Sequence, residues 1–101
     1  MKTKRSEYSA VVKKVIAYID SLPGGKAINI HGGAYTERGT PDVIGCVNGR
    51  MVVFECKRGD EALERIQLYR LEQWYDAGAI VGGVSDVWHV DMILRLMGIV
   101  E

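Results

Sequence analysis

The sequence predicts an α/β fold in which a mixed central sheet is flanked by helices, with the order αβββαβα. Two observations carry this prediction. The first is a pair of strand-like runs separated only by Asn48-Gly49, the dipeptide that favours a two-residue hairpin turn. The second is a helical segment that follows this hairpin and leads into another short strand, which implies a parallel crossover and a sheet covered on both faces.

Length and composition are those of one small globular domain. The chain has 101 residues, of which 48% are hydrophobic, and 13 Lys and Arg balance 13 Asp and Glu. This length allows one domain over residues 1–101 with a modest core, and the composition excludes a disordered chain. No apolar run approaches the roughly 18 residues of a membrane span. The basic start leads into an amphipathic segment without the apolar stretch of a secretory signal, so we expect a cytoplasmic protein with no membrane partner.

Hydrophobic spacing and turn residues place the elements along the chain. The first helix has an apolar face over Tyr8–Ile19 and ends near residue 21. Gly78 ends the second helix, and Ser85 or Asp86 caps the third. The other expected segments are a strand over 27–31, a loop over 32–40, strands over 42–47 and 50–57, a helix from 59 or 60 to about 77, a strand over 80–84 and a helix over 87–97.

The hairpin brings together three side chains that could take part in catalysis. With the register that a two-residue turn imposes, Asp42 faces Glu55 across the two strands. Lys57 lies two residues beyond Glu55 and therefore on the same face of the sheet. The hairpin alone thus assembles two carboxylates and an ammonium group.

Two facing carboxylates indicate a metal site. Their Cβ atoms lie about 5 Å apart in such a pair, and like charges there destabilise the sheet unless something offsets them. Mg²⁺ suits this position because it prefers oxygen ligands and leaves part of its coordination shell to water and phosphate. Lys57 would add positive charge where a phosphodiester transition state becomes more negative, or would hold the attacking water. The three side chains together favour phosphodiester hydrolysis.

The alternative is a structural role for the same residues. Asp42 can belong to a Thr40-Pro41-Asp42 turn, and Glu55 and Lys57 can form an exposed pair on an edge strand. However, the residues before Glu55, Val52–Phe54, have the profile of an interior strand, where unpaired charges are costly. These apolar neighbours favour the functional interpretation.

Four further residues are candidates because of their positions. Glu7 lies in the first helical turn, where it either stabilises the helix dipole or reaches a metal through a water. Gln67 lies within the apolar stripe of the second helix, either as a core amide or as part of the site. His31 ends a short strand and could line the site, and Arg38 could bind a phosphate from the loop.

Other conspicuous residues are expected to have structural roles. Cys46 and Cys56 lie on opposite faces of the hairpin, which argues against a disulfide, and both are expected to be small buried hydrophobic residues. Their spacing does not indicate zinc. Trp74 and Trp88 are expected to pack and not to stack on bases, and His89 has no assigned role.

Charge is distributed unevenly along the chain. Residues 1–14 carry five positive charges and one negative charge, whereas residues 71–101 carry one positive and five negative charges. Such a run can be a solvated face, but it can also bind the phosphates of a nucleic acid. The candidate contacts are Lys4, Arg5, Lys13, Arg38 and Arg58.

These residues together resemble a known pattern. Gly39-Thr40-Pro41-Asp42, then Glu55-Cys56-Lys57, then Gln67 in the following helix resemble the signature of PD-(D/E)XK nucleases, and specifically of the virus-type replication-repair nuclease (VRR-NUC) domain. The resemblance implies a restriction-endonuclease-like core that uses Mg²⁺ or Mn²⁺ to cut DNA. It implies that Asp42 and Glu55 bind the metal, with the Cys56 backbone carbonyl as a third ligand and Glu7 completing the acidic set. Lys57 would orient or activate the water, and Gln67 would assist near the site.

The resemblance also bears on partners. The chain is similar to small stand-alone members of the family from phages and bacteria, which resemble Holliday-junction resolvases. A globule of this length has a radius of gyration of about 13 Å, and a twofold dimer would match the symmetry of a four-way junction. We therefore expect a homodimeric, structure-selective endonuclease in a bacterial or phage-infected cell. The alternatives are a flap, nicking or end-acting nuclease, or a non-catalytic nucleic-acid-binding module with the same fold.

Overall fold

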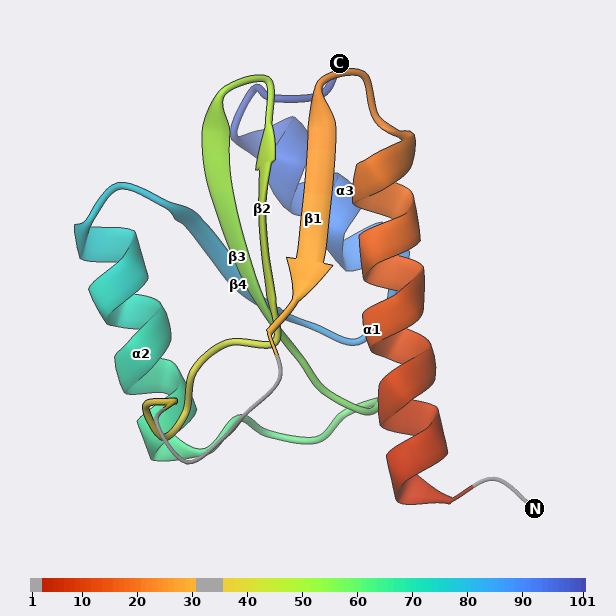
Figure 1. The fold of residues 1–101 in the computed structure, drawn as a ribbon, viewed down its shortest axis with the longest axis vertical. Coiled ribbons are helices and arrows are strands. Elements are labelled where there is room, and N and C mark those ends of the chain that lie inside the picture. Colours follow the sequence, from red (N-terminus) through yellow and green to blue (C-terminus); the bar gives the residue numbers. More distant parts are fainter. Residues whose placement is uncertain (1–2, 31–35) are drawn as a thin grey trace.

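In the computed structural model, which describes residues 3–30 and 36–101, three helices surround one sheet of four strands (Figure 1). The order of elements is αβββαβα, as predicted. In chain order they are α1 (Lys4–Ser21), β1 (Gly25–Asn29), β2 (Val43–Val47), β3 (Arg50–Cys56), α2 (Arg65–Asp76), β4 (Ile80–Val84) and α3 (Val87–Leu96).

Helices cover both faces of the sheet (Figure 1). On one face, α1 and α3 enclose the larger part of the core, in which Val15, Phe54 and Leu94 are fully buried. On the other face, Leu71 of α2 packs with Val53 in a second buried cluster. Adjacent residues of β3 thus point into different helical layers. This double cover explains why the strand is apolar without strict alternation.

The predicted hairpin and its register are confirmed. Asn48 and Gly49 have positive φ angles of 50° and 83°, as a type I′ turn requires. The antiparallel pairs between β2 and β3 run from Val47 opposite Arg50 to Val43 opposite Phe54. Asp42 is the next residue after the last of these pairs, so the register brings it to the end of β3.

The strand β3 is an interior strand. The sheet order is β1-β2-β3-β4, with β3 antiparallel to β2 and parallel to β4. Parallel pairing requires a crossover, which α2 provides. The alternative of an exposed edge strand carrying Glu55 and Lys57 is therefore wrong, since β3 has a neighbour on each side.

Two element boundaries differ from the predicted ones. The strand β1 spans residues 25–29 instead of 27–31, and His31 lies outside the described residues. The helix α2 begins at Arg65 and not at residue 59 or 60. The acidic residues that suggested an earlier start belong to a turn, in which the backbone N–H of Glu61 donates to the carbonyl of Arg58 (2.9 Å). The helix begins instead where the side-chain oxygen of Gln67 accepts from the backbone N–H of Glu64 (2.7 Å), which satisfies a free amide group.

Two packing predictions are also corrected. Cys46 is exposed, whereas Cys56 is buried, and both cysteines are free. Trp74 packs against the core on the α2 side, as expected, but 57% of Trp88 is exposed. Asp86 caps α3, since its carboxylate accepts from the backbone N–H of Val87 (2.6 Å).

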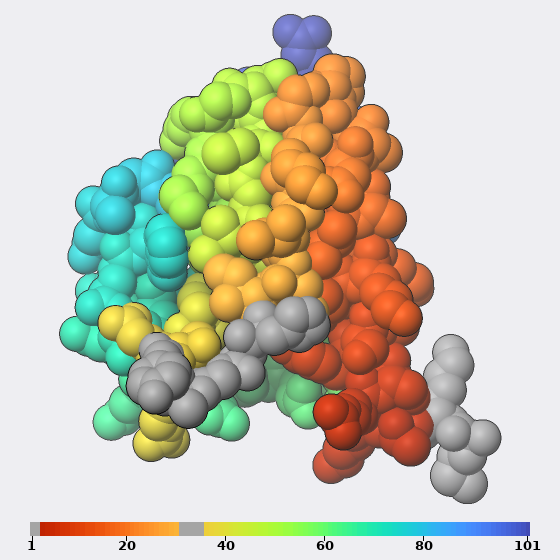
Figure 2. Space-filling model, viewed as in Figure 1, coloured from red at the N-terminus to blue at the C-terminus, as the bar shows by residue number. Residues whose placement is uncertain are grey.

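The outer surface shows how the layers are arranged. In Figure 2, α1 and α2 flank an exposed surface formed by β1 and β2. Ile28 on β1 is 54% exposed. Among the described residues, no helix combines the length and apolar character needed to span a bilayer.

Candidate functional site

Asp42 is held at three points at the start of β2. Its backbone carbonyl accepts from the N–H of Ile30 (2.7 Å), which prolongs the pairing of β1 and β2 by one residue. Its carboxylate oxygen Oδ2 accepts from the backbone N–H of Cys56 (2.7 Å). The side chain of Asp42 thus accepts the hydrogen bond that a backbone carbonyl accepts elsewhere between the two strands. The other oxygen, Oδ1, accepts from the hydroxyl of Tyr8 on α1. The carboxylate therefore connects β2, β3 and α1.

Glu55 lies beside Asp42 and is almost entirely buried. Only 2% of the residue is exposed, and its Oε2 atom has no hydrogen-bond partner. Burial raises the pKa of the Glu55 carboxyl well above its usual range, and a hydrogen bond with the Asp42 carboxyl and the negative charges of Asp42 and Glu64 raise it further. Ionisation of Glu55 is therefore costly unless a cation is bound beside it.

The two carboxyl groups fit a divalent cation. A buried oxygen atom without a partner beside a second carboxylate is the kind of donor set that Mg²⁺ or Mn²⁺ binds, and such a cation would offset the repulsion between the two groups. Within residues 3–30 and 36–101, no three His, Cys, Asp or Glu side chains form a complete ligand cluster. Asp42 and Glu55 would thus leave coordination positions to backbone, water and substrate, which is typical of Mg²⁺ sites.

Cys56 contributes to this region through its backbone. Its side chain is buried in the core on the side of α1 and α3, while its N–H binds Asp42. Burial, followed by the charges of Asp42 and Glu55, raises the pKa of the Cys56 thiol, so the sulfur stays protonated. The expected role of the Cys56 backbone carbonyl as a metal ligand stays a prediction.

Lys57 continues β3 by one residue toward a hollow in the surface. Its backbone N–H donates to the carbonyl of Val84 (2.9 Å), and its ammonium group donates to the carbonyl of Gly59 (2.9 Å). Within the described part of the chain, no ion pair joins Lys57 to Asp42 or Glu55. The hollow has a volume of about 240 Å³ and is lined by Tyr8, Cys56, Lys57, Glu61, Ala62, Leu63, Glu64 and Gln67.

Gln67 caps the start of a helix and lines the hollow next to Lys57. It is half-buried, its side-chain oxygen caps the start of α2 at Glu64, and it lines the same hollow as Lys57. The cap uses the carbonyl end of the amide. Capping therefore fixes the orientation of the amide at the wall of the hollow.

Glu7 lies next to the site in an ion pair. Its carboxylate is 2.7 Å from the guanidinium of Arg58, which also contacts Glu61 at 3.2 Å. The hydrogen bonds that Arg58 donates to Glu7 and Glu61 raise the pKa of its guanidinium. In Figure 1 the segment after β3 approaches the N-terminal half of α1 before it returns to α2. Glu7 therefore anchors this segment, and two carboxylates balance the charge of Arg58.

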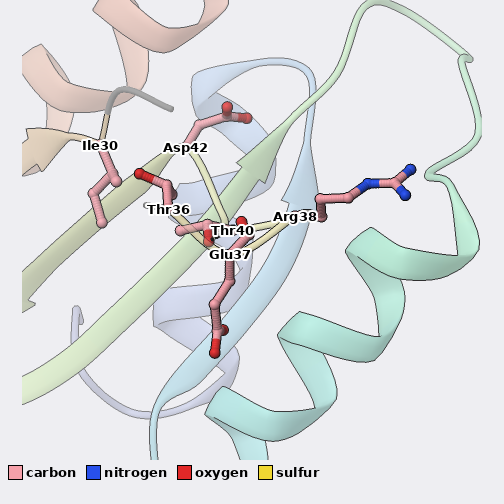
Figure 3. Close-up of a pocket in the computed structure, with 7 residues that line it drawn as sticks. Ile30, Thr36, Glu37, Arg38, Thr40 and Asp42 are labelled. Atoms are coloured by element: carbon pink, nitrogen blue, oxygen red, sulfur yellow. Dashed lines mark hydrogen bonds between the residues drawn. The ribbon is translucent and has the colours of Figure 1, made fainter. Parts of the chain in front are cut away.

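A second hollow opens on the other side of Asp42. It has a volume of about 440 Å³ and is lined by Ile30, Thr36, Glu37, Arg38, Gly39, Thr40 and Asp42. Figure 3 shows the side chain of Arg38 pointing away from the Asp42 carboxylate. Arg38 is exposed at the rim of this hollow and does not contact the carboxylates in this structure.

The loop that leads to Asp42 is attached to α2. The guanidinium of Arg70 donates to the carbonyl of Arg38 (2.9 Å) and lies 3.6 Å from the carboxylate of Glu37. Gly39 has a φ angle of 78°, and a Cβ atom there would lie 2.8 Å from the backbone oxygen of Ile66. Glycine thus allows both the turn and the close approach of the loop to α2.

The remaining basic candidates lie on α1. Lys4, Arg5 and Lys13 are exposed. Arg5 and Lys13 border a shallow hollow of about 410 Å³ with Thr3, Ser6, Ser9 and Ala10. Because Tyr8 belongs to the same helix, these cations lie on the element that contacts Asp42.

Two residues at the site were not singled out from the sequence. Tyr8 was assigned only to the apolar face of the first helix, although it also binds Asp42. Arg70 was not assigned to the site. No local pattern marks either residue, because each acts on a segment more than thirty positions away.

Comparisons with known proteins agree with the geometry. No protein-family model matches the sequence, and no curated protein matches it significantly. A solved structure described as a VRR_NUC domain is similar at 22% identity, with a TM-score of 0.70 over 88% of this chain and 95% of that chain. Another, described as a VRR_NUC domain protein, has 16% identity and a TM-score of 0.69 over 100% of this chain and 93% of that chain. The fold of this chain is therefore that of the VRR_NUC domains.

Proposed function

We propose that this protein is a metal-dependent nuclease that hydrolyses phosphodiester bonds in DNA. The observation that carries the proposal is the pair of adjacent carboxyl groups, Asp42 and Glu55, of which Glu55 is buried with an unpartnered oxygen. A protein that only bound nucleic acid would gain nothing from two acids at this position, since they repel each other and the phosphates. The fold shared with the VRR_NUC domain structures supports the same class of activity.

The metal site would consist of Asp42 and Glu55, with the backbone carbonyl of Cys56 as a further ligand. Bound there, Mg²⁺ or Mn²⁺ would polarise the scissile phosphate and lower the pKa of a coordinated water. Glu7 is the additional acid of the family pattern. Its ion pair with Arg58 keeps it beside this region, from which it could act through water.

Lys57 and Gln67 would act from the hollow next to the carboxylates. The ammonium of Lys57 rests on the Gly59 carbonyl, a neutral acceptor that it can leave for a more negative group. A phosphate entering the hollow supplies such a group, and the lysine would then stabilise the charge that develops during hydrolysis or hold the attacking water. The amide of Gln67 would form a wall of the same hollow.

The DNA strand would pass along the edge of the sheet where both hollows open. Lys4, Arg5 and Lys13 would contact phosphates from α1, and Arg38 would do so from the loop. Arg58 would contribute mainly by holding the site together, because Glu7 and Glu61 already engage it.

The proposed activity predicts metal-dependent cleavage that requires both a carboxylate and the lysine. A labelled four-way junction, a flap and a linear duplex are incubated with the protein in Mg²⁺, Mn²⁺ or EDTA. We expect cutting with either metal, no cutting in EDTA, and a loss of about 10²-fold or more in Asp42→Ala and Lys57→Ala. Lys26→Ala, on the exposed surface of β1, is the matched control and should cut like the wild type.

The choice of DNA in the same experiment separates the alternatives. Preferential cutting of the junction supports a resolvase-like, structure-selective enzyme, and preferential cutting of the flap or of duplex ends supports the other nuclease types. Binding of the junction without cleavage in either metal would contradict the nuclease and favour a binding module.

The site also predicts that Glu55 favours metal binding at the expense of the stability of the metal-free protein. Glu55→Gln keeps the shape of the side chain and removes a buried acid, so the metal-free variant should unfold at or above the wild-type temperature. In the wild type, Mn²⁺ at 100 times its Kd should add about 2.7 kcal/mol, a rise of roughly 10–20 °C. Glu55→Gln should lose most of this rise, whereas Glu72→Gln on the exposed face of α2 should keep it. Thermal unfolding measures this rise. If Mn²⁺ raises the unfolding temperature of both variants equally, Glu55 binds no metal.

We further propose that the enzyme acts as a homodimer on branched DNA. The longest dimension of one copy is 36 Å, about the length of one duplex turn of 34 Å, so a single copy spans one arm of a junction. On α3, Trp88, Met92 and Leu96 recur every four residues and are 57%, 44% and 79% exposed. Such an apolar stripe on a small protein is typical of an interface.

A second copy of the chain is the proposed occupant of this stripe. Asp91 and Arg95 lie on the same helix and are joined at 2.9 Å, so the flank of the stripe carries both signs of charge. Two copies of α3 packed antiparallel about a twofold axis can place unlike charges opposite each other.

Sedimentation at micromolar concentration tests this interface. We expect a dimer for the wild type, a monomer for Leu96→Glu, and a dimer for Leu68→Glu, which introduces the same charge at a 53% exposed position on α2. A monomeric wild type, or a Leu96→Glu variant that remains a dimer, would contradict the proposed interface.

A further inference from the structure

Tyr8 reaches from α1 to the carboxylate that the proposed metal site depends on. Its hydroxyl donates to Oδ1 of Asp42. Its half-buried ring packs against the core between α1 and the sheet. Tyr8 also lines the hollow that contains Lys57 and Gln67. It therefore stands between the proposed ligand and the space in which a substrate phosphate would lie.

The two oxygens of Asp42 are each held by a different donor. Tyr8 binds Oδ1 and the backbone N–H of Cys56 binds Oδ2. A carboxylate has about four lone-pair positions, so these two donors and the Glu55 carboxyl still leave an acceptor position for a cation. With two donors on opposite ends, the carboxylate cannot rotate about its bond to Cβ without breaking a hydrogen bond.

Neither donor belongs to the strand that carries Asp42. The N–H of Cys56 is part of the sheet backbone, whereas Tyr8 is supplied by a helix that packs on the sheet. The ion pair of Glu7 with Arg58 fixes the same turn of α1 to the segment that follows β3. The position of the Tyr8 hydroxyl is therefore set by contacts on both sides of the site.

We propose that Tyr8 is a positioning residue that fixes the Asp42 carboxylate for divalent-cation binding. This inference rests on the proposed function, in which Asp42 and Glu55 are the metal ligands. Groups that hydrogen-bond to metal ligands orient them and tune their affinity, and removing such a group typically weakens metal binding 10- to 100-fold. Tyr8 does not need to touch the metal or the substrate to have this effect.

The chain contains a matched control for this interaction. Tyr18, also on α1, donates its hydroxyl to Oδ1 of Asp91 on α3 at 2.5 Å. Tyr8→Phe and Tyr18→Phe thus remove the same atom from the same helix and break the same kind of bond to an aspartate. Only the first of these bonds involves a proposed metal ligand.

The proposal is tested by measuring Mn²⁺ binding to the DNA-free protein. The paramagnetic resonance signal of free Mn²⁺ reports how much of the metal is unbound. We expect Tyr8→Phe to raise the Kd by 10- to 100-fold, and Tyr18→Phe to leave it within about threefold of the wild type. Thermal unfolding without metal provides the structural readout, and the two variants should lose similar amounts of stability.

The outcomes separate this proposal from the proposed function. If the wild type binds Mn²⁺ and Tyr8→Phe binds it equally well, the positioning role is wrong while the metal site stands. If both tyrosine variants weaken binding equally, the effect reflects the stability of α1 and the positioning role is again wrong. If the wild type binds no Mn²⁺, the proposed metal site itself is wrong, and the inference falls with it.

Discussion

The close approach of Asp42 and Glu55 at the end of the β2–β3 hairpin is the constraint around which the site is built. Glu55 is only 2% exposed, and one of its oxygens has no hydrogen-bond partner. Placing a second acid beside it raises the cost of ionisation further. A fold selected for stability alone would place apolar residues there, as it does along the rest of β3. The unpartnered oxygen beside a second carboxyl group supports the proposed cation site.

The surrounding elements hold this pair in place from three directions. The sheet supplies the N–H of Cys56, α1 supplies the hydroxyl of Tyr8, and α2 holds the loop before Asp42 through Arg70. Each of these contacts comes from a different layer of the fold. The geometry of the site thus depends on the packing of both helical layers against the sheet, which links the stability of the core to the arrangement of the carboxylates.

The hairpin and its register could be predicted because their signals are local. Asn48 and Gly49 both need positive φ angles, and this turn leaves one register for the two strands, which brings Asp42 to Glu55. The interior position of β3 followed from its apolar run. These predictions needed no information about how distant segments pack.

The features that could not be predicted depend on contacts between distant segments. Tyr8 lies on an apolar helix face, where its hydroxyl gives no sign of a partner thirty-four residues away. The start of α2 was misplaced because Glu61 resembles an acid of a first helical turn, while the cap is made by Gln67. Trp88 was expected to be a packing residue, yet α3 turns it outward into an apolar stripe.

The central claim is that Asp42 and Glu55 together bind a divalent cation, and crystals soaked in Mn²⁺ test it most directly. The anomalous scattering of manganese should give a peak within about 2.5 Å of a carboxylate oxygen of both residues. Loss of that peak in crystals of Glu55→Gln would strengthen the assignment. A manganese peak elsewhere, or none at a concentration that supports DNA cleavage, would contradict it.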